Sequence, residues 1–152
     1  VLGWSGEDIG YLRPVGMWLG GLLGLSAGLL TLYFGKRFLL LFFITCQALI
    51  FLAVSTFTTD TPDTLATIAI IGIDAVDAGW SVLIFSILMA LCTSNTSATN
   101  FGIFMGFGNI SMLIGNNIAP LVLGSGDYSF AFLVAALTLI PCWLTGYYLT
   151  RS

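Results

Sequence analysis

Two aspartates inside a long apolar run are the residues with the clearest chemical potential. Asp74 and Asp77 are the acidic residues of a run that extends from about residue 64 to residue 91. Side chains three residues apart share one face of a helix. The helical rise places Asp74 about 15 Å inside a hydrocarbon core that is about 30 Å thick. Because an ionised carboxylate at that depth is costly without water, a cation or a polar partner, the pair predicts a proton or cation site, or a substrate contact.

Two structural interpretations of the aspartates stay open. One is a protonated carboxyl that bonds a neighbouring helix. The other is a tilted or broken helix that leaves both carboxylates near the outer surface. The functional interpretation is the default for acids within a membrane helix.

Amide and hydroxyl side chains gather in the run that follows. Asn109 lies about 16 Å along a helix that begins at Ala98, a depth comparable with that of Asp74. Such an amide either lines a cavity or bonds one helix to another. Further candidates for a cavity or gate are Trp80, Asn100, Ser111, Asn116 and Asn117.

Glycines recur at every fourth position in two of the apolar runs. Small residues at this spacing allow two helix backbones to approach closely. The spacing therefore predicts helix packing, without naming a ligand, at Gly16, Gly20, Gly24 and Gly28, and again at Gly102 and Gly106.

The composition decides the class of protein. Of the 152 residues, 58% are hydrophobic and 7% are charged, whereas soluble domains carry about 25% charged residues. A soluble enzyme, a disordered tail and a nucleic-acid binder are thereby excluded. The chain has no histidine, and its three cysteines show no CxxC spacing. We therefore expect no metal site, no cofactor and no enzymatic activity, because no nucleophile–base pair is available.

Apolar runs separated by short polar segments predict one all-α domain with about five transmembrane helices. The expected spans cover about residues 14–34, 38–57, 64–91, 98–123 and 128–149. The continuous runs are about twice as long as barrel strands, which have about 10 residues. Three basic residues fall at one side of this arrangement, and the acidic loop residues fall at the other. The positive-inside rule then predicts a multi-pass protein with its N-terminus outside and its C-terminus in the cytoplasm.

Several stretches resemble the muropeptide permease and acetyl-coenzyme A transporter branch of the major facilitator superfamily. The Leu- and Met-rich residues 88–92, followed by Ala98–Phe101, are similar to a helix end and the next helix start in that branch. The glycine-rich first run that closes on Gly35 is similar to the superfamily's eighth helix. The resemblance implies the last five helices of a twelve-helix carrier. Ser111 and Met112 stand where the branch has an arginine, which argues against an anionic substrate.

Two functions follow as expectations. The first is a secondary-active transporter, coupled to protons or cations, that moves a small organic solute and works with a missing N-terminal half. The second is a non-transporting scaffold or accessory subunit, derived from such a carrier, that packs against other membrane subunits. In both, the bilayer is a partner and nucleic acid is not.

Overall fold

The computed structural model describes residues 6–58, 60–92, 97–123 and 128–149. Within these ranges the chain is helical and has no strand. The helices are α1 (Gly6–Ser55), α2 (Asp63–Leu91), α3 (Ser97–Leu123) and α4 (Tyr128–Leu149). This confirms the expected all-α class.

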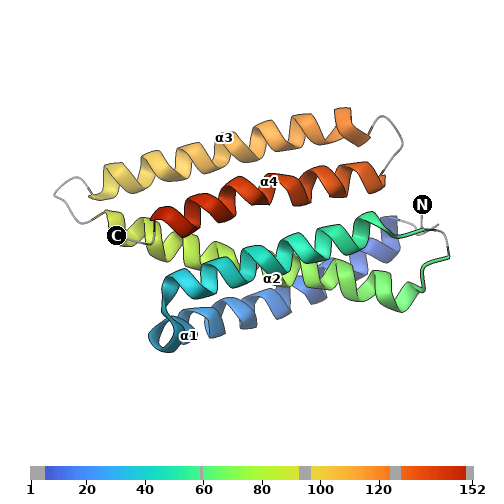
Figure 1. Cartoon of the computed structure of the whole chain (residues 1–152), viewed down its shortest axis with the longest axis horizontal. Coiled ribbons are helices and arrows are strands. Elements are labelled where there is room, and N and C mark those ends of the chain that lie inside the picture. The colour runs from blue at the N-terminus through green and yellow to red at the C-terminus, as the bar shows by residue number, and fades with distance from the viewer. Residues whose placement is uncertain (1–5, 59, 93–96, 124–127, 150–152) are drawn as a thin grey trace.

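Helix α1 is two helices joined at a sharp reversal. Gly35 has φ 77° and ψ 151°, a backbone conformation that residues with a Cβ rarely adopt. The chain turns back there, so that residues 6–34 form a first arm and residues 36–55 form a second arm beside it (Figure 1). The reversal at Gly35 is where the sequence predicts the end of one span and the start of the next.

The helix ends agree closely with the expected spans except at the start of α1, which begins at Gly6 and not near residue 14. The number of helices that could cross a membrane also differs. Three helices are long and apolar enough to cross a membrane: Gly10–Ser55, Asp63–Ala90 and Tyr128–Tyr148. The first of these contains both arms of α1, and therefore two of the expected spans. Among the described residues, α3 is not one of these three helices.

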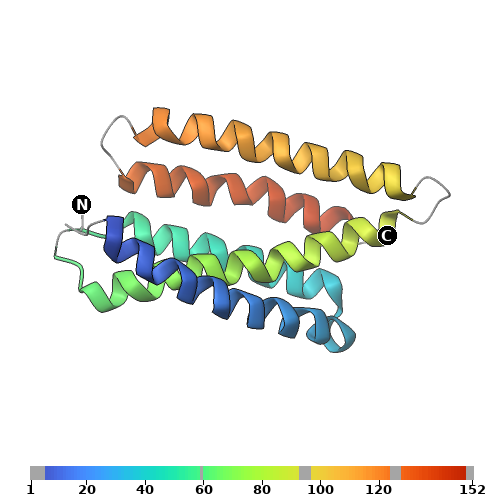
Figure 2. The ribbon, with the colours of Figure 1, turned by 180° about the vertical axis from the view of Figure 1, so that it is seen from behind.

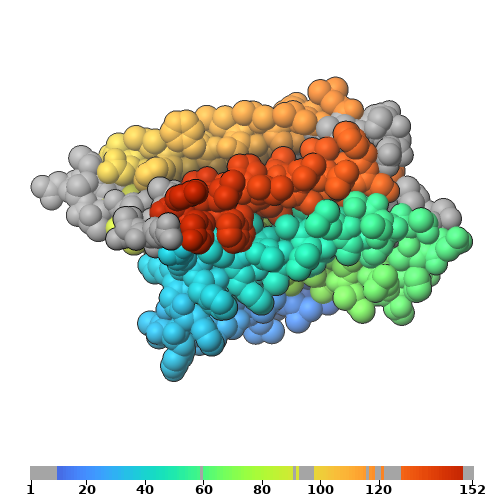
Figure 3. All heavy atoms as spheres, viewed as in Figure 1, coloured from blue at the N-terminus to red at the C-terminus, as the bar shows by residue number. Residues whose placement is uncertain are grey.

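The core lies where the second arm of α1 meets its neighbours. Helix α1 packs most extensively against α2 and next against α4, whereas α3 makes few contacts with α2 and α4. The views from the two sides show the first arm and α2 running in the same direction, with α3 at the far edge (Figure 2). On one face α4 lies between α3 and the second arm (Figure 3). The main buried cluster consists of Ala27, Leu39, Leu40, Phe43, Ile44 and Leu83.

Candidate functional site

A glycine-lined contact between the first arm of α1 and α2 positions the candidate site. A Cβ built on Gly20 would lie 2.8 Å from Ala78 Cβ and 3.1 Å from the Asp74 carbonyl oxygen. A Cβ on Gly24 would lie 3.0 Å from Val82 Cγ2. Since residues 20 and 24 meet residues 78 and 82, the two helices keep the same spacing and run parallel through this contact. Close approach of this kind needs residues without a Cβ.

Asp74 lies at the N-terminal end of the same contact. A Cβ on Gly16 would lie 2.8 Å from Asp74 Cβ and 3.0 Å from Asp74 Oδ2. Gly16 therefore makes room for the carboxylate as well as for the helix. The first arm covers Oδ2, which is buried and accepts no hydrogen bond from the described residues.

Arg13 supplies a cation for this carboxylate. Arg13 Nε lies 4.0 Å from Asp74 Oδ2, beyond hydrogen-bond distance, and the arginine side chain is 62% exposed. Arg13 lies within α1, one turn before Gly16. The contact is thus a partly screened ion pair at the edge of the bundle.

Asp77 has different surroundings on the neighbouring part of α2. The Trp80 indole Nε1 donates a hydrogen bond of 3.0 Å to Asp77 Oδ1. Trp80 itself packs against the buried cluster, whereas Asp77 is exposed in the isolated chain. Trp80, predicted as a cavity residue, therefore orients one carboxylate of the pair.

The rise per residue gives the distance of the two aspartates from the ends of α2. Asp74 lies about 16 Å from the start of α2 at Asp63, and Asp77 lies about 21 Å from the end at Leu91. Both distances are a large part of a hydrocarbon core of about 30 Å. The pair therefore belongs to the central part of the helix, away from its ends.

The polar residues of α3 remain apart from this pair. Ser111 Oγ donates to the Phe107 carbonyl oxygen at 2.9 Å, and Asn117 Nδ2 donates to that of Leu113 at 2.8 Å. Both bonds tie the side chain to its own helix. Asn109 is exposed, Asn100 is half-buried with a partner, and the side chain of Asn116 lies outside the described part.

The three remaining predicted packing glycines do not approach another helix. A Cβ on Gly28, Gly102 or Gly106 would meet nothing within 4 Å in the described structure. Gly28 is exposed, although its neighbour Ala27 is buried in the main cluster. The two glycines of α3 are open because α3 packs loosely.

One buried polar residue was missed by the sequence reasoning. Gln47, in the second arm of α1, is 3% exposed, and its Oε1 accepts no hydrogen bond within the described residues. Phe43 and Leu40 on the same face meet Gly79 of α2 and Gly146 of α4. A lone glutamine in the apolar run 38–57 is the sequence signal that marks it.

The described residues contain no group of three or more His, Cys, Asp or Glu side chains placed to hold a metal ion. The arrangement offers instead one buried carboxylate oxygen beside an arginine, and a second carboxylate oriented by an indole. The chain matches no protein-family model, no curated protein and no solved structure.

Proposed function

We propose that this chain is the C-terminal part of a secondary-active transporter of the major facilitator type. It moves a small organic solute coupled to a proton or another cation. The observation that carries the proposal is the Asp74 carboxylate, whose Oδ2 is buried beside Arg13 without a hydrogen bond in an otherwise apolar bundle.

The energetics of the carboxylate favour a functional role over a structural one. A structural aspartate in a membrane helix is satisfied by donors from neighbouring helices, because an unsatisfied buried acceptor costs about 1–3 kcal/mol. Asp74 Oδ2 has a positive charge 4.0 Å away but no donor in the described part of the chain. This oxygen is suited to accept a proton or to contact a cation that arrives and leaves.

The proposed architecture has five membrane spans. Each arm of α1 forms one span, with α2, α3 and α4 as the others. The N-terminus is outside and the C-terminus cytoplasmic, with the basic residues that follow Gly35 on the cytoplasmic side. Asparagines on α3 are tolerated because they face a cavity completed by the N-terminal half. Asp77, Trp80 and Asn109 are the proposed solute contacts.

Charge indicates the class of solute. The site brings together two acidic side chains, Asp74 and Asp77, and one basic side chain, Arg13. This balance favours a neutral or cationic solute over an anion.

Uptake into proteoliposomes that hold a pH-sensitive dye tests the proposal. The whole transporter is screened against small organic solutes, and the wild type acidifies the lumen when its solute is added outside. Asp74→Asn removes the ionisable group with little change in size, so we expect acidification to be lost. Asp60→Asn, at an exposed aspartate outside the helices, is the matched control and should retain it. If the Asp74→Asn variant acidified the lumen as much as the wild type, Asp74 would not couple transport to protons.

A second candidate is a scaffold subunit, and the open surface of α3 favours it. Gly102 and Gly106 face no other helix in the described structure, and most of α3 is exposed. Another membrane subunit could cover this surface in place of a transporter half. Intact mass from the native membrane separates the two candidates. A twelve-helix carrier has a mass of about 45 to 60 kDa, whereas a subunit of this length alone has a mass of 16.2 kDa.

A further inference from the structure

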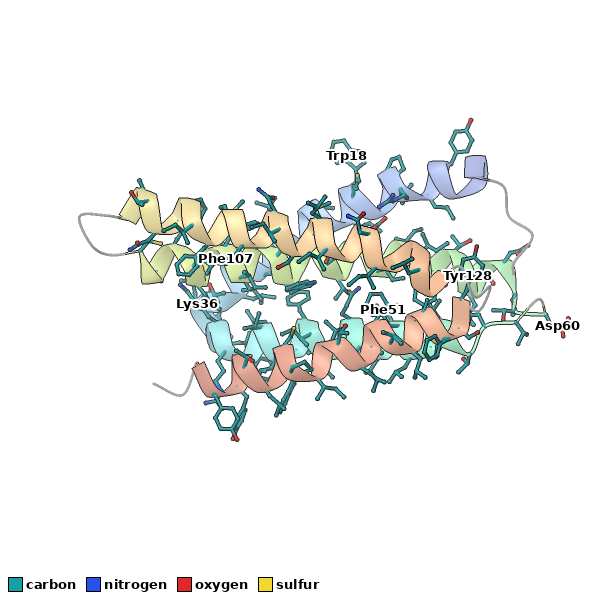
Figure 4. All side chains as sticks on the ribbon, turned by 90° about the horizontal axis from the view of Figure 1, so that it is seen from above. Trp18, Lys36, Phe51, Asp60, Phe107 and Tyr128 are labelled. Carbon is teal, nitrogen blue, oxygen red and sulfur yellow. The ribbon has the colours of Figure 1, made fainter. Side chains whose placement is uncertain are left out.

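Two basic residues lie at the end of the bundle opposite the loop that contains Asp60. Lys36 and Arg37 follow the reversal at Gly35 directly. Lys36 and Asp60 mark opposite ends of the molecule (Figure 4). Both basic residues lie where the arms of α1 meet, so any membrane surface at this end of the bundle passes close to them.

Arg37 is held by an aromatic stack. Its guanidinium carbon lies 4.5 Å from the centroid of the Tyr147 ring on α4. Trp143 stacks on Tyr147, with ring centroids 5.6 Å apart and planes inclined by 5°. A guanidinium over an aromatic ring is held by the cation–π attraction and still has N–H donors with which it can bind two oxygens of one phosphate.

Lys36 contacts α2, whereas Arg37 contacts α4. Its Nζ donates to the Ser86 carbonyl oxygen at 3.4 Å, which occupies one of three ammonium donors. The lysine and the arginine are adjacent in sequence but are anchored on α2 and α4. The two cations therefore flank the short stretch of surface at the start of the second arm.

No carboxylate balances this positive charge within the part of the chain that the structure describes. The ion pair found there joins Arg13 and Asp74. On α2, the acid nearest to Ser86 is Asp77, nine residues away and about 13 Å along the helix. An anion from outside the chain is thus the natural partner of Lys36 and Arg37.

We propose that Lys36, Arg37 and the Tyr147 stack form a binding site for the phosphate of an anionic glycerophospholipid. Tyr and Trp side chains gather at the depth of lipid headgroups, which places the phosphate within reach of both cations. Anionic lipids attract basic residues at the cytoplasmic surface. The acyl chains lie along the apolar exposed side chains near the turn, such as Phe34 and Phe38. The inference requires that the bundle lies in a bilayer, and it holds for a carrier or a scaffold alike.

Native mass spectrometry of the full chain in detergent tests the site. Phosphatidylglycerol is titrated in parallel with phosphatidylcholine of the same acyl chains and with inorganic phosphate. We expect phosphatidylglycerol to bind more tightly than either. Lys36→Gln and Arg37→Gln should each weaken its binding about fivefold, and together about 30-fold, since a basic residue near an anionic surface contributes about 1 kcal/mol.

The controls separate a defined binding site from nonspecific attraction between basic residues and anionic lipids. Arg13→Gln removes a cation from the opposite end and should leave phosphatidylglycerol binding unchanged. Tyr147→Leu keeps every charge but removes the stack that fixes the guanidinium, so it should weaken binding even where the double variant fails to fold. The proposal would be overturned if the two lipids bound equally, or if Arg13→Gln weakened phosphatidylglycerol binding as much as Lys36→Gln or Arg37→Gln. It would also be overturned if Tyr147→Leu left binding unchanged, or if inorganic phosphate displaced the lipid at a similar concentration.

Discussion

Adding one methyl group at Gly20 should loosen the contact that carries the candidate site. The Cβ of alanine at this position would lie 2.8 Å from Ala78 Cβ and 3.1 Å from the Asp74 backbone carbonyl. Neither atom is the end of a flexible side chain, so the first arm of α1 must move away from α2. The Asp74 carboxylate would then lose the cover that the arm provides.

Gly28→Ala is the matched control and gives the magnitude. A Cβ at Gly28 meets nothing within 4 Å, so this variant gains only the helix preference of alanine, about 1 kcal/mol. Gly20→Ala has the same gain but adds an overpacking cost of about 1–3 kcal/mol. Because the helix term is common to both, Gly20→Ala should be less stable than Gly28→Ala by about 1–3 kcal/mol.

Reversible unfolding in detergent, followed by circular dichroism, measures this difference. Ala78→Gly removes the nearest atom and should restore part of the stability of Gly20→Ala, with a coupling energy of about 0.5–3 kcal/mol in a double-mutant cycle. The reasoning fails if Gly20→Ala is as stable as Gly28→Ala, or if the two changes simply add.

Two further substitutions test the turn and the indole contact. Gly35→Ala should lower stability by about 1–3 kcal/mol, because φ 77° with ψ 151° is a conformation that only glycine adopts readily; a melting temperature equal to that of the wild type would contradict it. Trp80→Phe removes the donor to Asp77 and should cost about 1 kcal/mol in the same unfolding assay. Trp18→Phe, at an indole that is 80% exposed and points away from the bundle, should change little; equal effects at the two tryptophans would refute the assigned hydrogen bond (Figure 4).

The positions of the helices could be predicted from the sequence because turns and apolar runs are local signals. Gly35 marks the reversal of α1, and the expected spans end close to the observed helices. Membrane crossing was predicted less well. The criterion of length and apolar character is met by three helices of the described part, one of which contains two expected spans, and α3 is not among them.

The contacts of the site could be predicted only in part. Glycines at every fourth position show which face of a helix lacks side chains. They do not show over what length of that face another helix makes contact. Gly16 meets Asp74, whereas Gly28 on the same pattern meets nothing. The spacing of Asp74 and Asp77 likewise placed them on one face, but it could not show that one lies beside Arg13 and the other beside Trp80.

Gln47 shows the limit of reasoning from residue types. Its burial follows from the second arm lying between α2 and α4, which is an arrangement of segments far apart in the sequence. A single amide in an apolar run carries no local sign of that arrangement.

Water access at residue 77 tests the proposed transport function most directly, because that function requires Asp77, but not the outer face of the first arm, to face an aqueous cavity. Asp77→Cys and Leu25→Cys are compared in proteoliposomes, with Cys46, Cys92 and Cys142 replaced by serine. Leu25 is 71% exposed in the isolated chain, so exposure alone does not separate the two positions.

A thiol reacts with a water-soluble reagent only where water allows a thiolate to form. We expect rapid labelling by a membrane-impermeant thiosulfonate at residue 77 and slow labelling at residue 25, where lipid or a partner helix covers the side chain. Equal labelling at both positions, or faster labelling at residue 25, would contradict the account.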